Sequence, residues 1–132
     1  MFGIYTFSRL QEESISWEPY SEKKLEIARE NSQPVIMDFY ADWCIPCLEL
    51  DRNTFVDREV IRTTKEFLRV KVDLTRFDSP ESESLRKKYN IAGVPTIVFL
   101  RPDGTEELSS RVIGYLPPDE FLTRIKPVVG SN

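Results

Sequence analysis

The length and composition of the chain are those of one globular domain: it has 132 residues, of which 40% are hydrophobic and 30% charged, which excludes disorder and fibrous structure. The net charge is -4 and the Lys and Arg residues are scattered among acids, which argues against a nucleic-acid partner. The sequence contains no histidine, which excludes Ser-His-Asp hydrolysis, Cys-His proteolysis and His-ligated metal sites.

The apolar stretches of the sequence are short. Residues 96–100 are a typical example, of strand size, and no stretch approaches the ~20 consecutive apolar residues that span a bilayer. Residues 1–10 lack a basic opening followed by an uninterrupted apolar run, so they do not predict a signal peptide. This leaves the compartment open, because a mature chain or a domain cut from a larger protein also lacks a signal peptide.

The first part of the chain predicts a lead-in, a helix and a buried strand. Residues 1–20 carry apolar side chains without a firm period, which indicates an extended N-terminal extension in which residues 15–17 pair as an edge strand. Ser21 is a suitable N-cap for a helix over residues 22–31. Residues 35–41 are almost continuously apolar, which is typical of a central strand covered on both faces.

The middle of the chain predicts a strand-helix-strand crossover. Residues 44–53 follow the buried strand directly and are expected to form a helix, with Leu48 and Leu50 available for burial. Residues 57–65 form a short helix capped by its first residue, an aspartate, and residues 67–74 form the next strand.

The last part of the chain predicts a helix, a hairpin and a closing helix. A Ser-Pro pair opens a helix over residues 81–89, and residues 96–100 form a strand that returns through a turn to residues 108–113. Two prolines then open a helix over residues 119–125. The order of elements predicts a single α/β domain.

The two cysteines of the sequence, Cys44 and Cys47, lie at the junction between the buried strand and the following helix. The first sulfur of such a pair meets the unpaired N–H groups at the start of the helix, which makes Cys44 more acidic. A thiolate attacks a disulfide and a second cysteine one turn later resolves the mixed disulfide, so we expect Cys44 to attack and Cys47 to resolve. The alternatives are two ordinary buried thiols or a static disulfide. No metal is expected, because a structural zinc site needs about four Cys or His ligands.

Asp38 is an anomaly inside the apolar strand that precedes the cysteines. An unpaired carboxylate is costly there and resists ionising, so the pKa of Asp38 should rise. A neutral carboxylic acid beside the second sulfur can take and return the proton that Cys47 exchanges. A solvated Asp38 facing a sheet edge is the alternative. Lys71 on the next strand could pair with Asp38 or be an ordinary exposed lysine, because alternation alone does not fix its face.

Val94-Pro95 precedes the strand over residues 96–100. Proline is acceptable at the first residue of a strand with a trans or a cis bond, and the sequence alone favours trans. A cis bond would leave the backbone of Val94 free to pair with an extended substrate beside the disulfide.

These motifs together closely resemble the thioredoxin family, over roughly residues 21–125. The matching residues are Asp38, residues 39–47 with the sequence Phe-Tyr-Ala-Asp-Trp-Cys-Ile-Pro-Cys, and residues 93–96 with the sequence Gly-Val-Pro-Thr. The resemblance implies the thioredoxin fold over residues 21–132, with a central mixed sheet flanked by helices. It also implies these roles: nucleophile Cys44, resolving thiol Cys47, buried proton carrier Asp38, its neighbouring lysine Lys71, cis-proline Pro95, and substrate contacts at Trp43, Ile45, Pro46 and Val94. Ile45 replaces the glycine usual in the family, which makes the active-site rim bulkier.

A narrower resemblance is to the family of C-terminal periplasmic domains of the transmembrane thiol:disulfide interchange protein DsbD. It rests on residues 41–44, residues 54–55, the longer segment 75–84 and residues 111–114. It implies a periplasmic monomer that takes electrons from a membrane-embedded cysteine pair and passes them to a second periplasmic domain, with no cofactor besides its own disulfide. The chain would be an excised domain or a free-standing relative. Asp51 stands where this family places a second carboxylate, usually Glu.

Two other functions stay open at this point: a general soluble thioredoxin recycled by a flavin reductase, which would place the chain in the cytoplasm, and a non-catalytic binding module. The presence of Cys44, Cys47, Asp38 and Pro95 argues against the binding module, which has no chemical need for them. Asp38 and Asp51, if ionised, would raise the pKa of Cys44 against the effect of the helix, so we expect a thiol less acidic than that of a typical thioredoxin.

Overall fold

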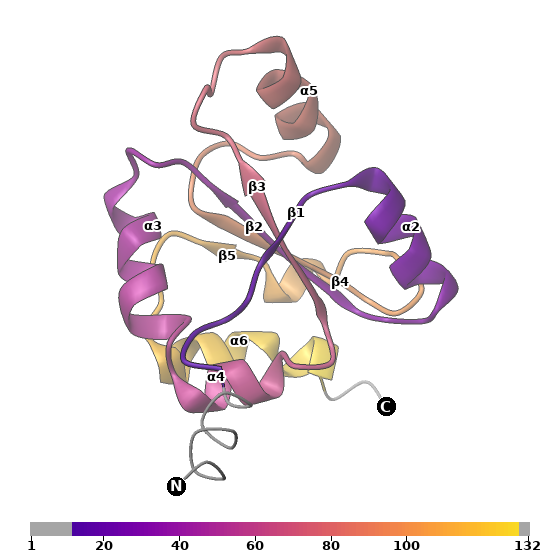
Figure 1. The fold of residues 1–132 in the computed structure, drawn as a ribbon, viewed down its shortest axis with the longest axis vertical. Helices are drawn as coiled ribbons and strands as arrows, with labels where there is room; N and C mark the ends of the chain where they lie inside the picture. The colour runs from indigo at the N-terminus through magenta and orange to yellow at the C-terminus, as the bar shows by residue number, and fades with distance from the viewer. Residues whose placement is uncertain (1–11, 130–132) are drawn as a thin grey trace, which may run out of the picture.

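The computed structural model describes residues 12–129 and shows a five-stranded sheet with helices on both faces (Figure 1). In chain order the elements are β1 (Glu18–Pro19), α2 (Glu22–Glu30), β2 (Val35–Tyr40), α3 (Ile45–Glu49), a π-helix (Leu50–Thr54), α4 (Arg58–Thr63), β3 (Leu68–Asp73), α5 (Pro80–Tyr89), β4 (Thr96–Leu100), a 3-10 helix (Leu108–Ser110), β5 (Val112–Ile113) and α6 (Pro118–Val129). The strand order is β1-β3-β2-β4-β5; β3 is parallel to β1 and β2, and β4 is antiparallel to β2 and β5. This mixed sheet confirms the predicted α/β fold class.

The central strand β2 supplies side chains to two cores, one on each face of the sheet. Ile36 belongs to the core formed with the π-helix, α4 and α6, whereas Met37 and Phe39 belong to the core formed with α2 and α5 (Figure 1). Because successive side chains of a strand point to opposite faces, Asp38 lies on the same face as Ile36. Lys71 is the register partner of Asp38 on β3 and shares that face. The alternation of β2 and its register with β3 therefore direct these two charged side chains toward the helical segment that follows the cysteines.

The helix caps predicted from the sequence are confirmed. The side chain of Ser21 accepts a hydrogen bond from the first turn of α2, Asp57 accepts two from α4, and Ser79 accepts one from α5. Asn90 ends α5 in the left-handed region with φ 57°.

The helix after the cysteines differs from the prediction in its second half. The expected α-helix over residues 44–53 becomes a π-helix at Leu50, where the N–H of Phe55 donates to the Leu50 carbonyl over 2.8 Å. Leu50 is fully buried, as expected, but Leu48 is 37% exposed, so the expected burial of Leu48 was wrong. The wider turn rotates the following residues relative to a regular α-helix, which a periodicity of 3.6 residues does not anticipate.

The N-terminal edge strand lies later than predicted. The prediction of an edge strand over residues 15–17 is corrected, because Glu18 and Pro19 are the residues that pair with β3. Ile15 is buried and donates its N–H to the Phe55 carbonyl at 2.9 Å, while the Trp17 ring packs edge-on against the Phe55 ring. The apolar side chains before β1 thus close the core instead of forming the strand. Residues 1–11 lie outside the described part of the chain.

The hairpin between β4 and β5 is shorter than predicted. Of the expected return strand over residues 108–113, only Val112 and Ile113 pair with β4, and the 3-10 helix takes the preceding residues. Two pairings show where the returning chain has extra residues. Between the isolated bridge Leu100–Glu106 and the pair Ile97–Val112, the chain advances three residues along β4 but six along the returning segment. The 3-10 turn absorbs this difference.

Candidate active site

The Cys44–Cys47 pair lies where β2 ends and α3 begins, and the two sulfurs form a disulfide. Cys44 is the N-cap residue of α3, and its Sγ accepts a hydrogen bond from the N–H of Cys47 at 3.2 Å. Both side chains are buried, each with 4% of its surface exposed. In the reduced protein, the Cys44 sulfur would therefore meet a backbone donor that favours the thiolate.

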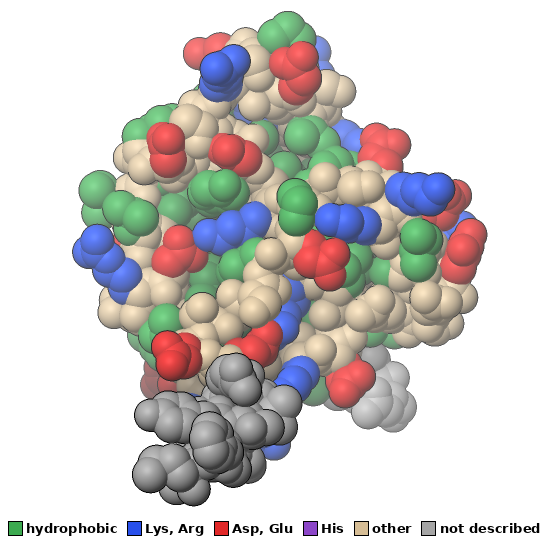
Figure 2. Space-filling model, viewed as in Figure 1, with side chains coloured by type: hydrophobic (Ala, Val, Ile, Leu, Met, Phe, Trp, Pro, Cys, Tyr) green, Lys and Arg blue, Asp and Glu red, His purple; other side chains and the backbone are tan. Residues whose placement is uncertain are grey.

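An exposed apolar rim surrounds this pair, and Figure 2 shows apolar side chains gathered over α3. Trp43 is 56% exposed and Ile45 63% exposed, whereas Pro46 is half-buried. The Trp43 indole N–H donates to the Thr75 carbonyl at 2.9 Å, and the Thr75 hydroxyl accepts from the N–H of Asp42 at 3.0 Å. The ring is thus held in place while more than half of the Trp43 surface stays exposed. Sequence reasoning missed Thr75, because no local pattern shows that the segment after β3 reaches Trp43.

Val94 lies directly beside the cysteines, and Pro95 follows it. The peptide bond between them is cis, as the resemblance to thioredoxins implied. Val94 packs against the cluster of Ala41, Cys44 and Cys47. Within the described residues, no hydrogen bond uses the N–H or the carbonyl of Val94. A free backbone edge therefore adjoins the disulfide, as an extended peptide substrate requires.

Asp38, Asp51 and Lys71 form a compact charge cluster. The Lys71 Nζ lies 3.0 and 3.1 Å from the two carboxylate oxygens of Asp51 and 3.7 Å from Oδ2 of Asp38. The Asp38 side chain is 3% exposed and that of Lys71 20%. The alternative of a solvated Asp38 is thereby excluded, and the side chain of Lys71 faces the cluster rather than solvent. Asp51 reaches Lys71 from the π-helix.

Burial raises the pKa of Asp38 from 3.8 to about 7. Lys71 opposes this rise through its positive charge and hydrogen bonding, and the negative charge of Asp51 adds to it. The other oxygen of Asp38, Oδ1, is buried and has no hydrogen-bond partner among the described residues. The carboxyl group is therefore present in both protonation states near neutral pH.

Tyr40 joins the cysteine pair to the charge cluster, and sequence reasoning missed it. Its side chain packs against the group that contains Cys44 and Cys47, and its ring lies 4.5 Å from the Lys71 Nζ. Burial raises the pKa of Tyr40, with further contributions from nearby aspartates, of which Asp73 has the largest effect. Its place as the last residue of β2, one turn before the cysteines, is the signal that could have identified it.

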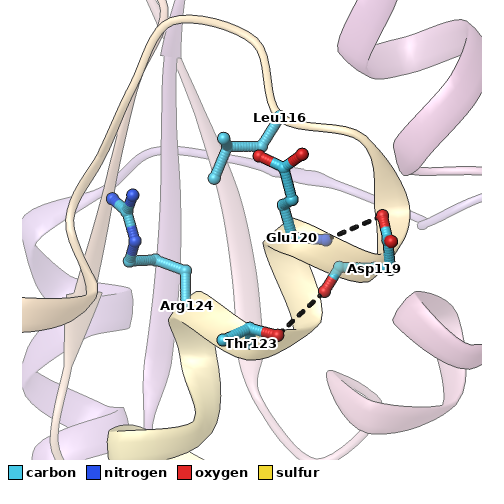
Figure 3. A pocket seen from close by; sticks show the side chains of 5 residues that line it. All are labelled: Leu116, Asp119, Glu120, Thr123 and Arg124. Atoms are coloured by element: carbon cyan, nitrogen blue, oxygen red, sulfur yellow. Dashed lines mark hydrogen bonds between the residues drawn. The ribbon is translucent and has the colours of Figure 1, made fainter.

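The surface has other hollows. One is at the start of α6 and is lined by Leu116, Asp119, Glu120, Thr123 and Arg124 (Figure 3). Its polar groups bond mainly to the helix itself: the Thr123 hydroxyl donates to the Asp119 carbonyl at 3.1 Å. Across residues 12–129, no group of three or more Asp, Glu, Cys or His side chains could hold a metal ion. In the same range, no helix combines the length and apolar character that membrane crossing requires.

The fold and the cysteine pair define the class of protein: a thiol-disulfide oxidoreductase of the thioredoxin fold, whose redox group is its own disulfide. The family of the thioredoxin-like domain matches residues 21–128, so the chain belongs to that family.

Two curated relatives are thiol:disulfide interchange proteins DsbD. The protein from Colwellia psychrerythraea is 34% identical over 107 residues, which cover 81% of this chain and 18% of that protein. The protein from Yersinia pestis is 36% identical over 100 residues, which cover 76% of this chain and 17% of that protein. The chain thus spans less than a fifth of the length of these relatives.

Solved structures of similar proteins match nearly the whole fold. The oxidised C-terminal domain of Neisseria meningitidis DsbD has a TM-score of 0.69 and 28% identity, covering 86% of this chain and 99% of that one. A thioredoxin from Thermus thermophilus has a TM-score of 0.71 and 29% identity, covering 87% of each chain. Both similarities extend well beyond the cysteine motif.

Proposed function

We propose that this chain is the electron-relaying C-terminal domain of a DsbD-type protein, or a free-standing relative of that domain, and acts as a monomer in the periplasm. It would take two electrons from a membrane-embedded cysteine pair and pass them to a second periplasmic domain. The observation that carries the proposal is the similarity to the Neisseria meningitidis DsbD domain over 99% of its length. Residues 21–132 would form the thioredoxin-like domain and residues 1–20 an N-terminal extension, which the family match beginning at residue 21 supports.

The proposed reaction is a pair of thiol-disulfide exchanges. The Cys44 thiolate attacks one sulfur of the partner's disulfide, so that an intermolecular S–S bond forms and the other partner sulfur leaves as a thiolate. The Cys47 thiolate then attacks the Cys44 sulfur, which forms the intramolecular disulfide and releases the second partner thiolate. The partner gains two electrons and this chain loses two.

Asp38 is the proposed proton acceptor for Cys47. Its pKa of about 7 means that both protonation states are populated near neutral pH, so it can take the Cys47 proton and later return it. Lys71 and Asp51 are proposed to adjust the charge around this carboxyl group, since Lys71 contacts both acids.

The exposed rim is the proposed contact surface for partner proteins. Trp43, Ile45 and Pro46 offer apolar surface next to the sulfurs. Val94 offers its unused N–H and carbonyl to an extended segment of the partner, and Pro95 fixes the start of β4 behind it.

The second candidate function is that of a general thioredoxin recycled by a flavin reductase. The similarity to the Thermus thermophilus thioredoxin favours it, because that thioredoxin is as similar to this chain as the DsbD domain is. The identities are 29% and 28%, and the TM-scores are 0.71 and 0.69. A cytoplasmic location would follow from that function.

Two reductions separate these functions. The reduced chain is mixed with the oxidised second periplasmic domain of a DsbD protein, and the oxidised chain is mixed with NADPH and a flavin thioredoxin reductase. We expect fast transfer in the first mixture and no NADPH oxidation in the second. The reverse result would establish the general thioredoxin. Cys44→Ser serves as the control, because it should abolish electron transfer in both mixtures. If the unmodified chain reduced no disulfide at all, the non-catalytic binding module would be the function that fits.

A further inference from the structure

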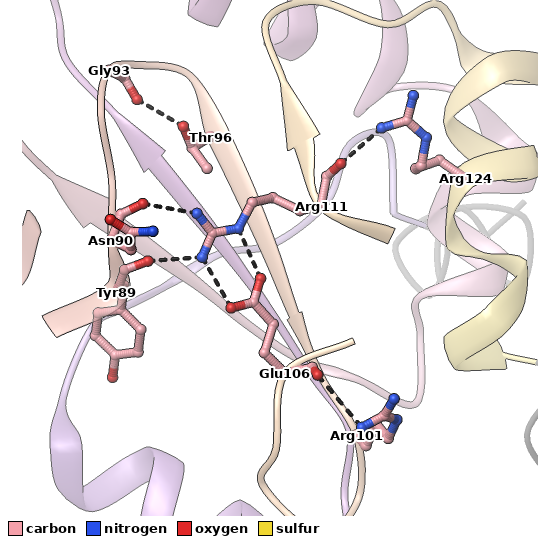
Figure 4. Close-up of polar contacts among 8 residues, drawn as sticks. All are labelled: Tyr89, Asn90, Gly93, Thr96, Arg101, Glu106, Arg111 and Arg124. Carbon is pink, nitrogen blue, oxygen red and sulfur yellow. Dashed lines mark hydrogen bonds and ion pairs between the residues drawn. The ribbon is translucent and has the colours of Figure 1, made fainter. Parts of the chain in front are cut away.

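Arg111 lies outside the active site described above, directly before β5, and it is nearly enclosed. Its side chain is 14% exposed and pairs with Glu106, whose side chain is 20% exposed. The guanidinium meets the carboxylate as a fork: Nε donates to Oε2 at 2.8 Å and Nη2 donates to Oε1 at 2.9 Å (Figure 4). Such bidentate pairs fix orientation as well as distance.

The same guanidinium also holds the end of α5. Its Nη2 donates to the carbonyl of Tyr89 at 2.7 Å, and its Nη1 donates to the carbonyl of Asn90 at 2.9 Å (Figure 4). These carbonyls belong to the last turn and the C-cap of α5, where a cation is favourable. Arg111 thus ties the C-terminus of α5 to the β4–β5 hairpin.

The loop of residues 91–95 runs from this tied helix end to β4, and its other end is held by the same hairpin. The N–H of Gly114, three residues after Arg111, donates to the Pro95 carbonyl at 3.0 Å. The Thr96 hydroxyl donates to the Gly93 carbonyl at 2.7 Å, which closes the loop on itself (Figure 4). Both ends of the loop that carries Val94 are therefore fixed by the short segment 111–114.

We propose that Arg111, held by Glu106, is a positioning residue that keeps the backbone of Val94 at the place beside the disulfide where an extended polypeptide pairs with it. Arg111 acts through the loop and touches no sulfur. This inference rests on the proposed function, because it requires a substrate with a peptide backbone. Small disulfides, which have no backbone to pair, do not need this positioning.

The hairpin also offers a matched control. Arg101 pairs with Glu107 at 2.8 Å and donates to the Thr105 hydroxyl at 3.0 Å, so it too is an arginine in a carboxylate pair. Within the described residues, Arg101 forms no hydrogen bond or ion pair with α5 or with residues 91–95. A lysine at either position keeps the charge and loses the fork.

The test compares two disulfides with the same chromophoric leaving group, nitrothiobenzoate. One is the symmetric aromatic disulfide dithiobis(nitrobenzoic acid), and the other joins nitrothiobenzoate to the cysteine of a short extended peptide. We expect Arg111→Lys to lower the second-order rate constant of the reduced protein with the peptide disulfide about tenfold, and with the aromatic disulfide less than about twofold. Arg101→Lys should leave both rate constants unchanged.

Amide hydrogen exchange provides the second readout. In Arg111→Lys the amides of Ile91 and Gly114 should exchange faster, whereas the Gly104 amide, which bonds to the Arg101 carbonyl, should not. If Arg111→Lys does not fold, Glu106→Gln removes the charge pair and keeps the guanidinium, and it should lower the peptide rate by a smaller factor of about three.

Equal losses with both disulfides, or an equal loss in Arg101→Lys, would overturn the positioning role. So would an unchanged peptide rate in a folded Arg111→Lys or Glu106→Gln protein. Failure of the proposed function has a different appearance, because the unmodified protein itself would then not reduce the oxidised second periplasmic domain, whatever the rates of the Arg111 variant.

Discussion

Replacing Asp38 by Asn should stabilise the oxidised protein at neutral and alkaline pH and not in acid. Asp38 is a carboxyl group with 2% of its surface exposed, on the central strand β2, with one buried oxygen that lacks a hydrogen-bond partner among the described residues. Burial makes its ionised form costly in the folded state, and the charge of Lys71 at 3.7 Å compensates only in part. Asparagine has the same shape and cannot ionise.

The magnitude and sign follow from the pKa of Asp38, about 7 in the folded protein and 3.8 for the ordinary group. Below pH 3.8 the carboxyl is protonated in both the folded and the unfolded chain, so it contributes no pH dependence there. Between pH 3.8 and about 7 the folded chain keeps a proton that the unfolded chain has lost, so the free energy of unfolding falls as the pH rises. At about 1.4 kcal/mol per pH unit, this loss amounts to about 4 kcal/mol and is complete above about pH 7.

Urea unfolding of the oxidised wild type and Asp38→Asn at a series of pH values measures this loss. The difference in free energy of unfolding should grow in favour of the variant by about 4 kcal/mol between about pH 4 and pH 8. Asp103→Asn is a control of opposite sign, because hydrogen bonds from Thr105 lower the pKa of exposed Asp103. A difference between wild type and Asp38→Asn that does not change with pH would refute the assignment of a raised pKa to Asp38.

Three further predictions test the site. Cys47→Ser should accumulate a mixed disulfide through Cys44 and Cys44→Ser should not, as mass spectrometry after incubation with an oxidised partner will show; equal trapping would contradict the assigned roles. Lys71→Met should raise the pKa of Asp38 above about 7, since the charge of Lys71 at 3.7 Å is worth about 2 to 4 kcal/mol depending on screening. Carboxyl carbon NMR of the oxidised protein measures the pKa of Asp38, and a lower pKa in the variant would contradict the ion pair. Asp38→Asn combined with Asp51→Asn should lower the pKa of the Cys44 thiol, followed by thiolate absorbance against pH, and an unchanged or higher pKa would exclude the electrostatic effect.

Most of the fold follows from local sequence patterns. The strand β2 has an almost continuous run of apolar residues, which indicates burial on both faces of the sheet, since a strand buried on one face alternates apolar and polar residues. The caps at Ser21, Asp57 and Ser79 are side chains that accept hydrogen bonds from the first N–H groups of a helix. These signals act within a few residues, so they can be read without knowing the tertiary contacts.

The elements that were misplaced depend on contacts between distant residues. Pro19 joins the sheet because Tyr20 next to it donates its N–H to the Lys71 carbonyl, far along the chain. The π-helix beginning at Leu50 is shaped by burial of Thr54, whose hydroxyl donates to the Leu116 carbonyl at 2.6 Å. Neither partner is visible from the local pattern.

The candidate site shows the same division. The Cys44–Cys47 pair and Asp38 were predicted because each is chemically unusual at its place in the sequence, whereas the face of Lys71 depended on the register between β2 and β3. Arg111 was predicted only as part of a motif, because its contacts with the end of α5 are to backbone carbonyls, which every residue has.

The arrangement of charges suits a proton transfer between Cys47 and Asp38. Lys71 lies 3.0 Å from Asp51 and 3.7 Å from Asp38, so one cation faces two acids. When Asp38 is ionised, the cluster carries one excess negative charge; when Asp38 takes the proton of Cys47, that charge moves to the sulfur and the total is unchanged. Moving an existing charge within a buried site avoids the cost of creating a second one there. On the proposed mechanism, Asp38 therefore makes a reactive thiolate available at Cys47 without adding charge to the interior, beside Tyr40, which packs against both the cysteines and Lys71.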